Sequence, residues 1–149
     1  MNLPEFDARI ISFCRKVSLP AARFALFLLF FWFGFLKIVG MSPASGVVER
    51  LFNETLAWLL PFGTFIVLFG VLECIIGILF LIPRAERVVI PIMLLHLLTT
   101  AGPLILLPGE VWTHWLVPTL EGQYIIKNIA LIALAIHIAS HLEPLKRSV

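Results

Sequence analysis

The chain has 149 residues, of which 60% are hydrophobic and 13% are charged. A soluble domain is typically about 45–50% apolar and about 25% charged, so this composition excludes an ordinary water-soluble globule. The net charge is +2, and the basic residues form no extended patch, which argues against binding of nucleic acid. We therefore expect a single integral membrane domain over residues 1–149, with the lipid bilayer as its main partner.

Four apolar segments are long enough to cross a bilayer, at residues 21–39, 63–82, 88–107 and 124–142. Each has roughly 20 residues, which matches a hydrocarbon core of about 30 Å at a rise of about 1.5 Å per residue. Backbone polar groups in lipid must be paired within their own segment, and the runs lack the alternation of barrel strands. The sequence therefore predicts an all-α membrane protein, a bundle of four transmembrane helices.

The distribution of basic residues predicts the orientation of the bundle. Eight of them flank one set of segment ends: Arg9, Arg15, Lys16, Arg23, Arg84, Arg87, Lys146 and Arg147. The connections on the opposite side carry one, Arg50. Because cytoplasmic loops are enriched in Lys and Arg, we expect both termini on the cytoplasmic side.

Two further stretches are amphipathic and are not predicted to span. Near the chain start, the residues on one helical face are Phe6, Ile10, Phe13 and Val17. Between the first two spans, residues 45–60 carry an apolar stripe of Val48, Leu51, Phe52, Leu56 and Leu59. We expect the first stretch to be an interfacial helix on the cytoplasmic surface and the second to lie across the outer face of the bundle.

Three charged residues fall within or beside the predicted spans. Glu73 lies near the midplane of the second, Lys37 at the outer end of the first, and Lys127 about one turn inside the outer end of the fourth. In one interpretation Glu73 pairs with one lysine as an internal tie while the other reaches the headgroups. In the other, the cluster lines a cavity open to the outer leaflet and contacts an anion or a quinone carbonyl. Glu121, at the outer mouth, is a candidate to neutralise the second lysine.

The histidines form a second polar group. His96, Thr99 and Thr100 share one arc of the third span, while His137 faces the same way as Lys127 on the fourth. Counted from the cytoplasmic edge, His96 and His137 lie at similar depth. Two such histidines could ligate a haem b iron, although no other metal site is predicted. The alternatives are imidazoles bonded to Thr99, Thr100 or a backbone carbonyl, and a proton relay.

Three short motifs resemble those of DoxX-like membrane proteins. FGFLK at residues 33–37 resembles the G-x-x-K signature that ends their first span. GVLECIIG at residues 70–77 resembles their second-span E-x-x-x-G, and EGQYIIKN at residues 121–128 resembles the segment entering their fourth span. The nearest branch is the YkgB/RclC type, which is linked to reactive-chlorine resistance in bacterial inner membranes.

The resemblance implies a bundle of four membrane helices in a bacterial inner membrane, with Lys37, Glu73 and Lys127 as its polar signature. Some DoxX-like proteins are associated with thiosulfate:quinone oxidoreduction or oxidative-stress complexes. We therefore expect a redox- or oxidative-stress-linked accessory or quinone-interacting subunit, with a membrane-protein partner or a second copy of itself. The alternative is a non-enzymatic chaperone or assembly factor that binds client transmembrane helices, and a small transporter is a third reading. Whether the chain is itself an enzyme stays open.

Overall fold

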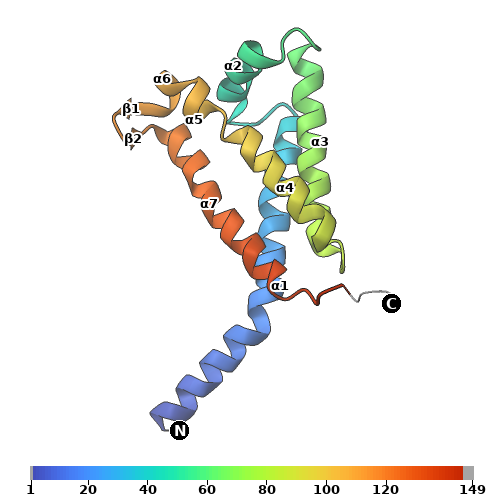
Figure 1. The fold of residues 1–149 in the computed structure, drawn as a ribbon, viewed down its shortest axis with the longest axis vertical. Coiled ribbons are helices and arrows are strands. Elements are labelled where there is room, and N and C mark those ends of the chain that lie inside the picture. The colour runs from blue at the N-terminus through green and yellow to red at the C-terminus, as the bar shows by residue number, and fades with distance from the viewer. Residues whose placement is uncertain (1, 146–149) are drawn as a thin grey trace.

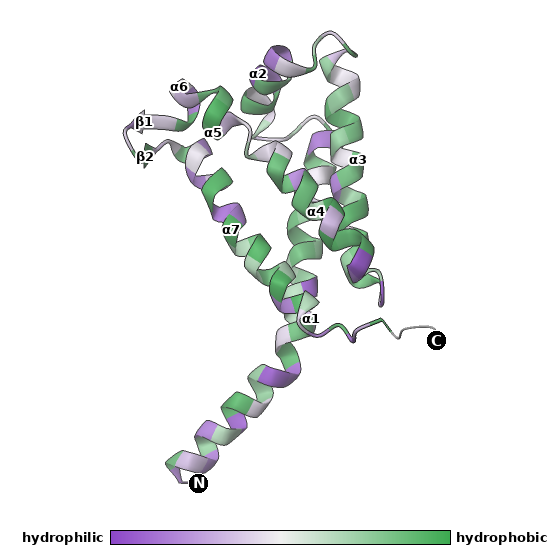
Figure 2. Cartoon of the chain, viewed as in Figure 1, coloured by the Kyte–Doolittle hydropathy of each residue, from purple (hydrophilic) through white to green (hydrophobic). Residues whose placement is uncertain are grey.

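The computed structural model describes residues 2–145 and is almost entirely helical (Figure 1). The long elements are α1 (Leu3–Ile38), α3 (Phe62–Leu81), α4 (Glu86–Thr100) continued by α5 (Pro103–Leu106), and α7 (Leu120–Ala139). By length and composition they supply four helices able to cross a membrane, which confirms the prediction of a multi-pass helical protein. Hydrophobic residues dominate these four helices (Figure 2). Lys146 and Arg147, two of the predicted topology signals, lie outside the described residues.

Helix α1 differs from the prediction because its two expected parts are one helix. It runs without interruption from Leu3 to Ile38 and contains Pro20. Burial begins at Ala22, and the N-terminal part projects away from the other helices (Figure 1). The separate N-terminal helix and the first span are therefore joined at a proline, which removes one helical hydrogen bond and favours a bend.

The C-terminus of α1 fixes the position of Lys37. Gly40 has a φ of 72°, and the N–H groups of Gly40 and Met41 donate to the carbonyls of Lys37 (3.3 Å) and Leu36 (2.8 Å). This is a Schellman motif, in which glycine adopts the left-handed conformation at no steric cost. Lys37 consequently lies in the last turn of α1, with its side chain buried inside the bundle.

Helices α1 and α3 are antiparallel and pack closely through glycines. A Cβ on Gly34 would lie 2.6 Å from the carbonyl oxygen of Gly70 and 2.8 Å from the Cβ of Glu73. A Cβ on Gly77 would lie 2.8 Å from the backbone nitrogen of Phe31. Small residues allow backbones to approach in this way in membrane helix pairs. The close approach brings the last turn of α1 against the middle of α3.

The core joins these two helices to α4 and, less extensively, to α7. Its buried members are Ala22, Leu26, Phe30, Ile76, Phe80, Val89, Met93, Leu97, Ala135 and Ile138. Helix α7 runs obliquely and approaches the bundle near its C-terminal end (Figure 1). Three of its residues are buried, namely Gly122, Ala135 and Ile138. Most of the apolar surface of α7 is therefore left for lipid or a partner.

The end of the bundle opposite the termini is capped by short elements. Helix α2 (Ser45–Thr55) is shorter than the predicted stretch 45–60, and it buries Phe52, whose ring lies beside those of Phe62 and Phe65. The sequence analysis did not foresee α6 (Pro108–Val111) or the antiparallel hairpin of β1 (Trp112–His114) and β2 (Val117–Pro118). These elements connect α5 to α7.

Candidate functional site: a buried Lys–Glu–His cluster

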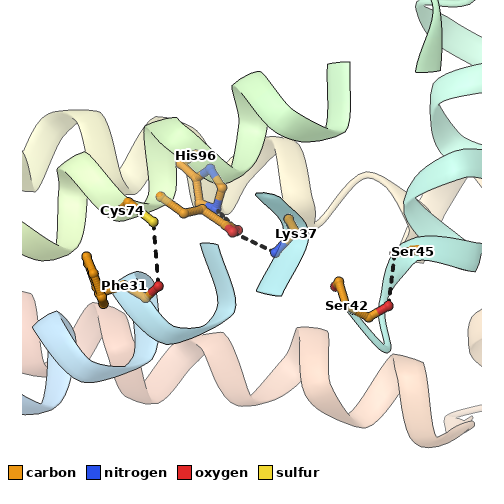
Figure 3. A network of polar contacts seen from close by, with 7 residues as sticks. Phe31, Lys37, Ser42, Ser45, Cys74 and His96 are labelled. Atoms are coloured by element: carbon orange, nitrogen blue, oxygen red, sulfur yellow. Dashed lines mark hydrogen bonds and ion pairs between the residues drawn. The ribbon is translucent and has the colours of Figure 1, made fainter. Parts of the chain in front are cut away.

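Glu73 is the centre of a cluster that joins three helices. Lys37 Nζ of α1 lies 2.6 Å from Glu73 Oε2, and His96 Nε2 of α4 lies 3.2 Å from Glu73 Oε1. Figure 3 shows Lys37 and His96 reaching this carboxylate from their separate helices. Each of the three residues is 5–6% exposed. The cluster is therefore a closed interior site, and it does not line the open cavity that one of the sequence interpretations required.

Two phenylalanines enclose the imidazole of His96. The Phe30 ring meets it edge-on with the ring centroids 5.6 Å apart, and the Phe69 ring lies 4.8 Å away. Lys37 Nζ is 5.8 Å from the centroid of Phe69, within the range of a cation–π contact. Phe30 is buried, whereas Phe69 is partly exposed. Phe69 thus separates the cluster from the molecular surface.

The hydrogen-bonding capacity of the cluster is not fully used. Each oxygen of Glu73 has a partner, and Lys37 compensates the charge of the carboxylate. His96 Nδ1 is buried and has no hydrogen-bond partner among the described residues. If Nε2–H donates to Glu73, Nδ1 is an acceptor in the neutral ring and a donor in the imidazolium. A buried polar atom without a partner costs about 1–3 kcal/mol, so this nitrogen is where a ligand or proton would bind favourably.

Lys127 and Glu121 lie elsewhere than the sequence analysis expected. Lys127 is exposed on α7, with its Nζ 5.3 Å from the ring centroid of Tyr124 one turn earlier. Glu121 is exposed in the first turn of α7. Among the described residues, no ion pair joins either of them to Glu73 or to each other. The oblique course of α7 explains this, because its outer half does not pack on α3.

The other polar residues of the third and fourth spans also differ from expectation. The hydroxyls of Thr99 and Thr100 donate to the carbonyls of His96 (2.7 Å) and Leu97 (3.0 Å), as is common for threonine inside a helix. Neither hydroxyl is hydrogen-bonded to the imidazole of His96. His137 lies against His141, with ring centroids 4.8 Å apart, and its Nε2 is buried with no hydrogen-bond partner between residues 2 and 145. No hydrogen bond or ring contact joins His96 and His137 within the described part of the chain, so the geometry brings no argument for haem.

A second ion pair, between the partly buried Arg23 and the buried Glu86, lies at the other end of the core and was not predicted from the sequence. Arg23 pairs with Glu86, and its Nε and Nη2 donate to the carbonyls of Phe80 and Ile82, each at 2.8 Å. Arg23 was interpreted from the sequence as a topology signal, and Glu86 was not singled out. The sequence did contain a signal for this pair, because Arg23 lies inside the first predicted span and Glu86 lies just before the third.

No family model matches the chain, and no curated protein or solved structure is similar enough to be matched to it. The resemblance to DoxX-like proteins therefore stays a prediction made from three short motifs. Any functional argument must start from the geometry of the cluster itself.

Proposed function

We propose that the chain is a DoxX-like protein of the bacterial inner membrane, with both ends on the cytoplasmic side. The support is the eight-to-one bias of basic residues between the two sides. In this orientation α2 (Ser45–Thr55) lies at the outer face and the N-terminal part of α1 at the cytoplasmic interface. The cluster of Lys37, Glu73 and His96 is then inside the membrane-spanning region.

In function, the protein would be a redox-linked accessory subunit that holds a quinone-class ligand. The observation that carries this proposal is that Nδ1 of His96 is buried beside an ion pair and has no hydrogen-bond partner among residues 2–145. Ionisable groups at such positions are costly, and by default they indicate a functional site. The electrons would come from a partner subunit of the same membrane.

The chemistry of the imidazole suits both states of a quinone. In the neutral ring, Nδ1 accepts a hydrogen bond, as the hydroxyl of a quinol requires. In the imidazolium, Nδ1–H donates one, as the carbonyl of a quinone requires, while Nε2–H donates to the Glu73 carboxylate. Lys37 would hold Glu73 in place.

Phe69 provides the route by which such a ligand would arrive. Its ring contacts His96 and is stacked on Phe65 at 5.3 Å, and both phenylalanines are partly exposed. Rotation of one side chain would open the cluster toward lipid, where quinones are dissolved. The displaced ring would then stack against the ligand, at an offset typical of aromatic pairs.

The test is binding of decylubiquinone to the full-length protein in lipid nanodiscs. A ligand at about 100 times its Kd stabilises the folded state by about 2.7 kcal/mol, which thermal unfolding detects. Glu73→Gln removes the carboxylate that supports the imidazolium, so we expect binding at least about tenfold weaker, as for loss of a charge-assisted hydrogen bond. His96→Gln keeps a donor toward Glu73 and removes Nδ1, and it serves if the first variant does not fold.

The matched control is Glu110→Gln, because Glu110 pairs with Arg50 in an exposed position outside the cluster. It should bind decylubiquinone like the unmodified chain. Equal stabilisation of the unmodified protein and both cluster variants would overturn the quinone proposal. A protein that decylubiquinone does not stabilise would overturn it as well.

A second candidate function, that of a non-enzymatic chaperone, has one observation in its favour. Helix α7 leaves large apolar side chains uncovered, including Tyr124 and Ile129 at 62% and 67% exposure. A client transmembrane helix could pack along that face, while the buried cluster would serve to hold the bundle. Photo-crosslinkers at Tyr124 and in α2 would capture a client helix if this function holds, and lipid alone if it does not.

A further inference from the structure

The first part of α1, residues 3–19, is a helix that meets the bundle only at its C-terminal end, where Leu19 packs against the core; we call it the N-terminal arm. Residues 2–16 are all exposed, and the arm points away from the bundle (Figure 1). Several of its large apolar residues are uncovered, among them Leu3 at 81% and Phe13 at 64% exposure. A face of this kind requires a covering surface, since apolar area in water is unfavourable by about 25 cal/mol per Å².

We propose that the N-terminal arm binds the anionic headgroup layer of the membrane, bending at Pro20 to lie along the bilayer surface. The whole of α1 is about 54 Å long, whereas the hydrocarbon core is about 30 Å thick. A straight α1 would therefore hold about 25 Å of amphipathic helix in water. Turning at Pro20 places the same residues at the headgroup boundary, directly beside the span that anchors them.

The bend is built into the chain. Pro20 has no N–H to donate to the carbonyl of Lys16, and its ring crowds that carbonyl. Two residues before it, the Ser18 hydroxyl donates to the Arg15 carbonyl at 3.3 Å. Beyond Pro20, Arg23 is fixed to Glu86 and to two backbone carbonyls, so the bundle side of the joint is rigid.

The charges of the arm fit an anionic surface. Its acidic residues, Glu5 and Asp7, are at the tip, where Glu5 lies in the first turn and interacts favourably with the helix dipole. The three residues nearer the span are basic: Arg9, Arg15 and Lys16. Arg9 and Lys16 both lie along one side of the apolar face, from which their long side chains reach headgroup phosphates. Hydrophilic and hydrophobic residues alternate along this helix (Figure 2).

A second copy of the arm is the other occupant to weigh, because the apolar spacing of Leu3, Phe6, Ile10, Phe13 and Val17 resembles a heptad pattern. The arm has 17 residues, from 3 to 19, which is about 2.4 heptads, whereas a coiled coil needs at least three to four. A parallel pair would also bring the basic residues of two arms together. Lipid is therefore the better-matched occupant, and this inference is independent of the quinone proposal.

The test measures the depth of single nitroxide labels on the full-length protein in liposomes with about 30% phosphatidylglycerol. Cys14, at the edge of the apolar face, carries one label in a Cys74→Ala background. Ser12→Cys, about 160° around the helix, carries the other in a Cys14→Ser, Cys74→Ala background. Embedding of the arm makes the label at 14 accessible to oxygen and protected from a water-soluble nickel chelate, and the label at 12 the reverse.

Charge dependence identifies the lipid. Each basic residue near an anionic surface contributes about 1 kcal/mol, so Arg9→Gln with Lys16→Gln should lower the ratio of embedded to free arm by roughly 25-fold. Arg50→Gln, at the other end of the molecule, should leave it unchanged. Equal exposure of both labels to the nickel chelate would overturn the inference. Spin–spin broadening at 14 that disappears on dilution with unlabelled protein would overturn it in favour of a second copy.

Discussion

The core contains two ion clusters, one buried and one largely buried, and they differ in the kind of polar atom that is left without a partner. At one end, the guanidinium of Arg23 bonds to the Glu86 carboxylate and to the carbonyls of Phe80 and Ile82. At the other, Lys37 and His96 share the carboxylate of Glu73, and one imidazole nitrogen has no partner within the described chain. In the first cluster all three guanidinium nitrogens are engaged, and the buried atom without a partner among the described residues is Glu86 Oε2, which as a carboxylate oxygen can only accept. In the second it is a ring nitrogen, which can either accept or donate.

Under the proposed function, the difference would separate a cluster that stabilises the fold from one that binds a ligand. Phe80 and Ile82 lie at the end of α3, and Glu86 begins α4, so Arg23 ties α1 to the connection between the next two helices. The planar guanidinium of Arg23, with its several donors, is suited to this structural role. The cluster of Glu73 instead combines a point charge with a titratable ring, a pairing suited to exchanging a proton or a ligand.

Among the changes that test this comparison, removal of the Arg23 guanidinium should cause the largest loss of stability. Arg23→Met leaves the Glu86 carboxylate buried without its counter-ion and leaves two carbonyls unpaired. Breaking a buried pair from one side typically costs about 3–5 kcal/mol, and we expect a loss of this size in unfolding by denaturant in lipid nanodiscs. Binding of decylubiquinone to the fraction that folds should be unchanged.

The double variant Arg23→Met, Glu86→Leu is the control for that prediction, since it removes both charges and keeps apolar volume. Replacement of a whole buried pair by apolar residues is often neutral, so most of the lost stability should return. A double variant as unstable as Arg23→Met alone would show that the backbone contacts of Arg23, and not its charge pairing, stabilise the core.

The fold was largely predictable from the sequence, because every span in lipid must pair its backbone polar groups within its own helix. The predicted residues 63–82 correspond closely to α3 (Phe62–Leu81), and residues 124–142 overlap α7 (Leu120–Ala139). The continuity of α1 through Pro20 was not predicted, since a proline is as consistent with a helix boundary as with a bend. The hairpin of β1 and β2 carried no strong turn signal.

The site was harder to predict because its members depend on helix directions that periodicity does not supply. Depth alone placed Glu73 and His96 near the midplane, but their contact depends on which faces of α3 and α4 meet. Lys127 matched the depth expected of a partner, yet the oblique course of α7 separates it from Glu73. The glycines Gly34 and Gly70 were the most informative sequence features for locating the site, because they mark the faces where α1 and α3 touch.

Close packing at Gly34 offers the next test, because it positions Lys37 against Glu73. In Gly34→Ala the new Cβ would meet Gly70, Glu73 and Cys74 at 2.6–2.9 Å, all on α3. The helices must separate, and overpacking of this kind costs about 1–3 kcal/mol. Gly63→Ala is the matched control, since a Cβ there has no neighbour within 4 Å. Equal stability of the two variants would contradict the tight contact.

His96→Gln should cause a smaller loss of stability, and it directly tests the role of His96 Nδ1. The amide of glutamine can occupy the position of Nε2 and donate to Glu73, so we expect destabilisation below about 1.5 kcal/mol. Decylubiquinone binding should nevertheless be lost. His96→Asn places its amide nearer Nδ1 and gives up the bond to Glu73, so it should be the less stable of the two. The reverse order of stability would mean that the Nε2 contact contributes little.

The exposed pair of Arg50 and Glu110 should give the smallest effect and so sets the scale for the two buried clusters. Their atoms are 3.0 Å apart, but the side chains are 56% and 36% exposed. Water and salt screen such a pair, and exposed pairs contribute about 0.2–1 kcal/mol. A double-mutant cycle with Arg50→Gln and Glu110→Gln should give a coupling energy in that range, falling toward zero in about 1 M salt. The same cycle on Lys37 and Glu73 should give a larger coupling that salt barely changes, because the bundle excludes the ions that screen the exposed pair. Equal salt dependence of the two cycles would mean that solvent reaches Glu73, and burial could then no longer explain why its cluster differs from a surface contact.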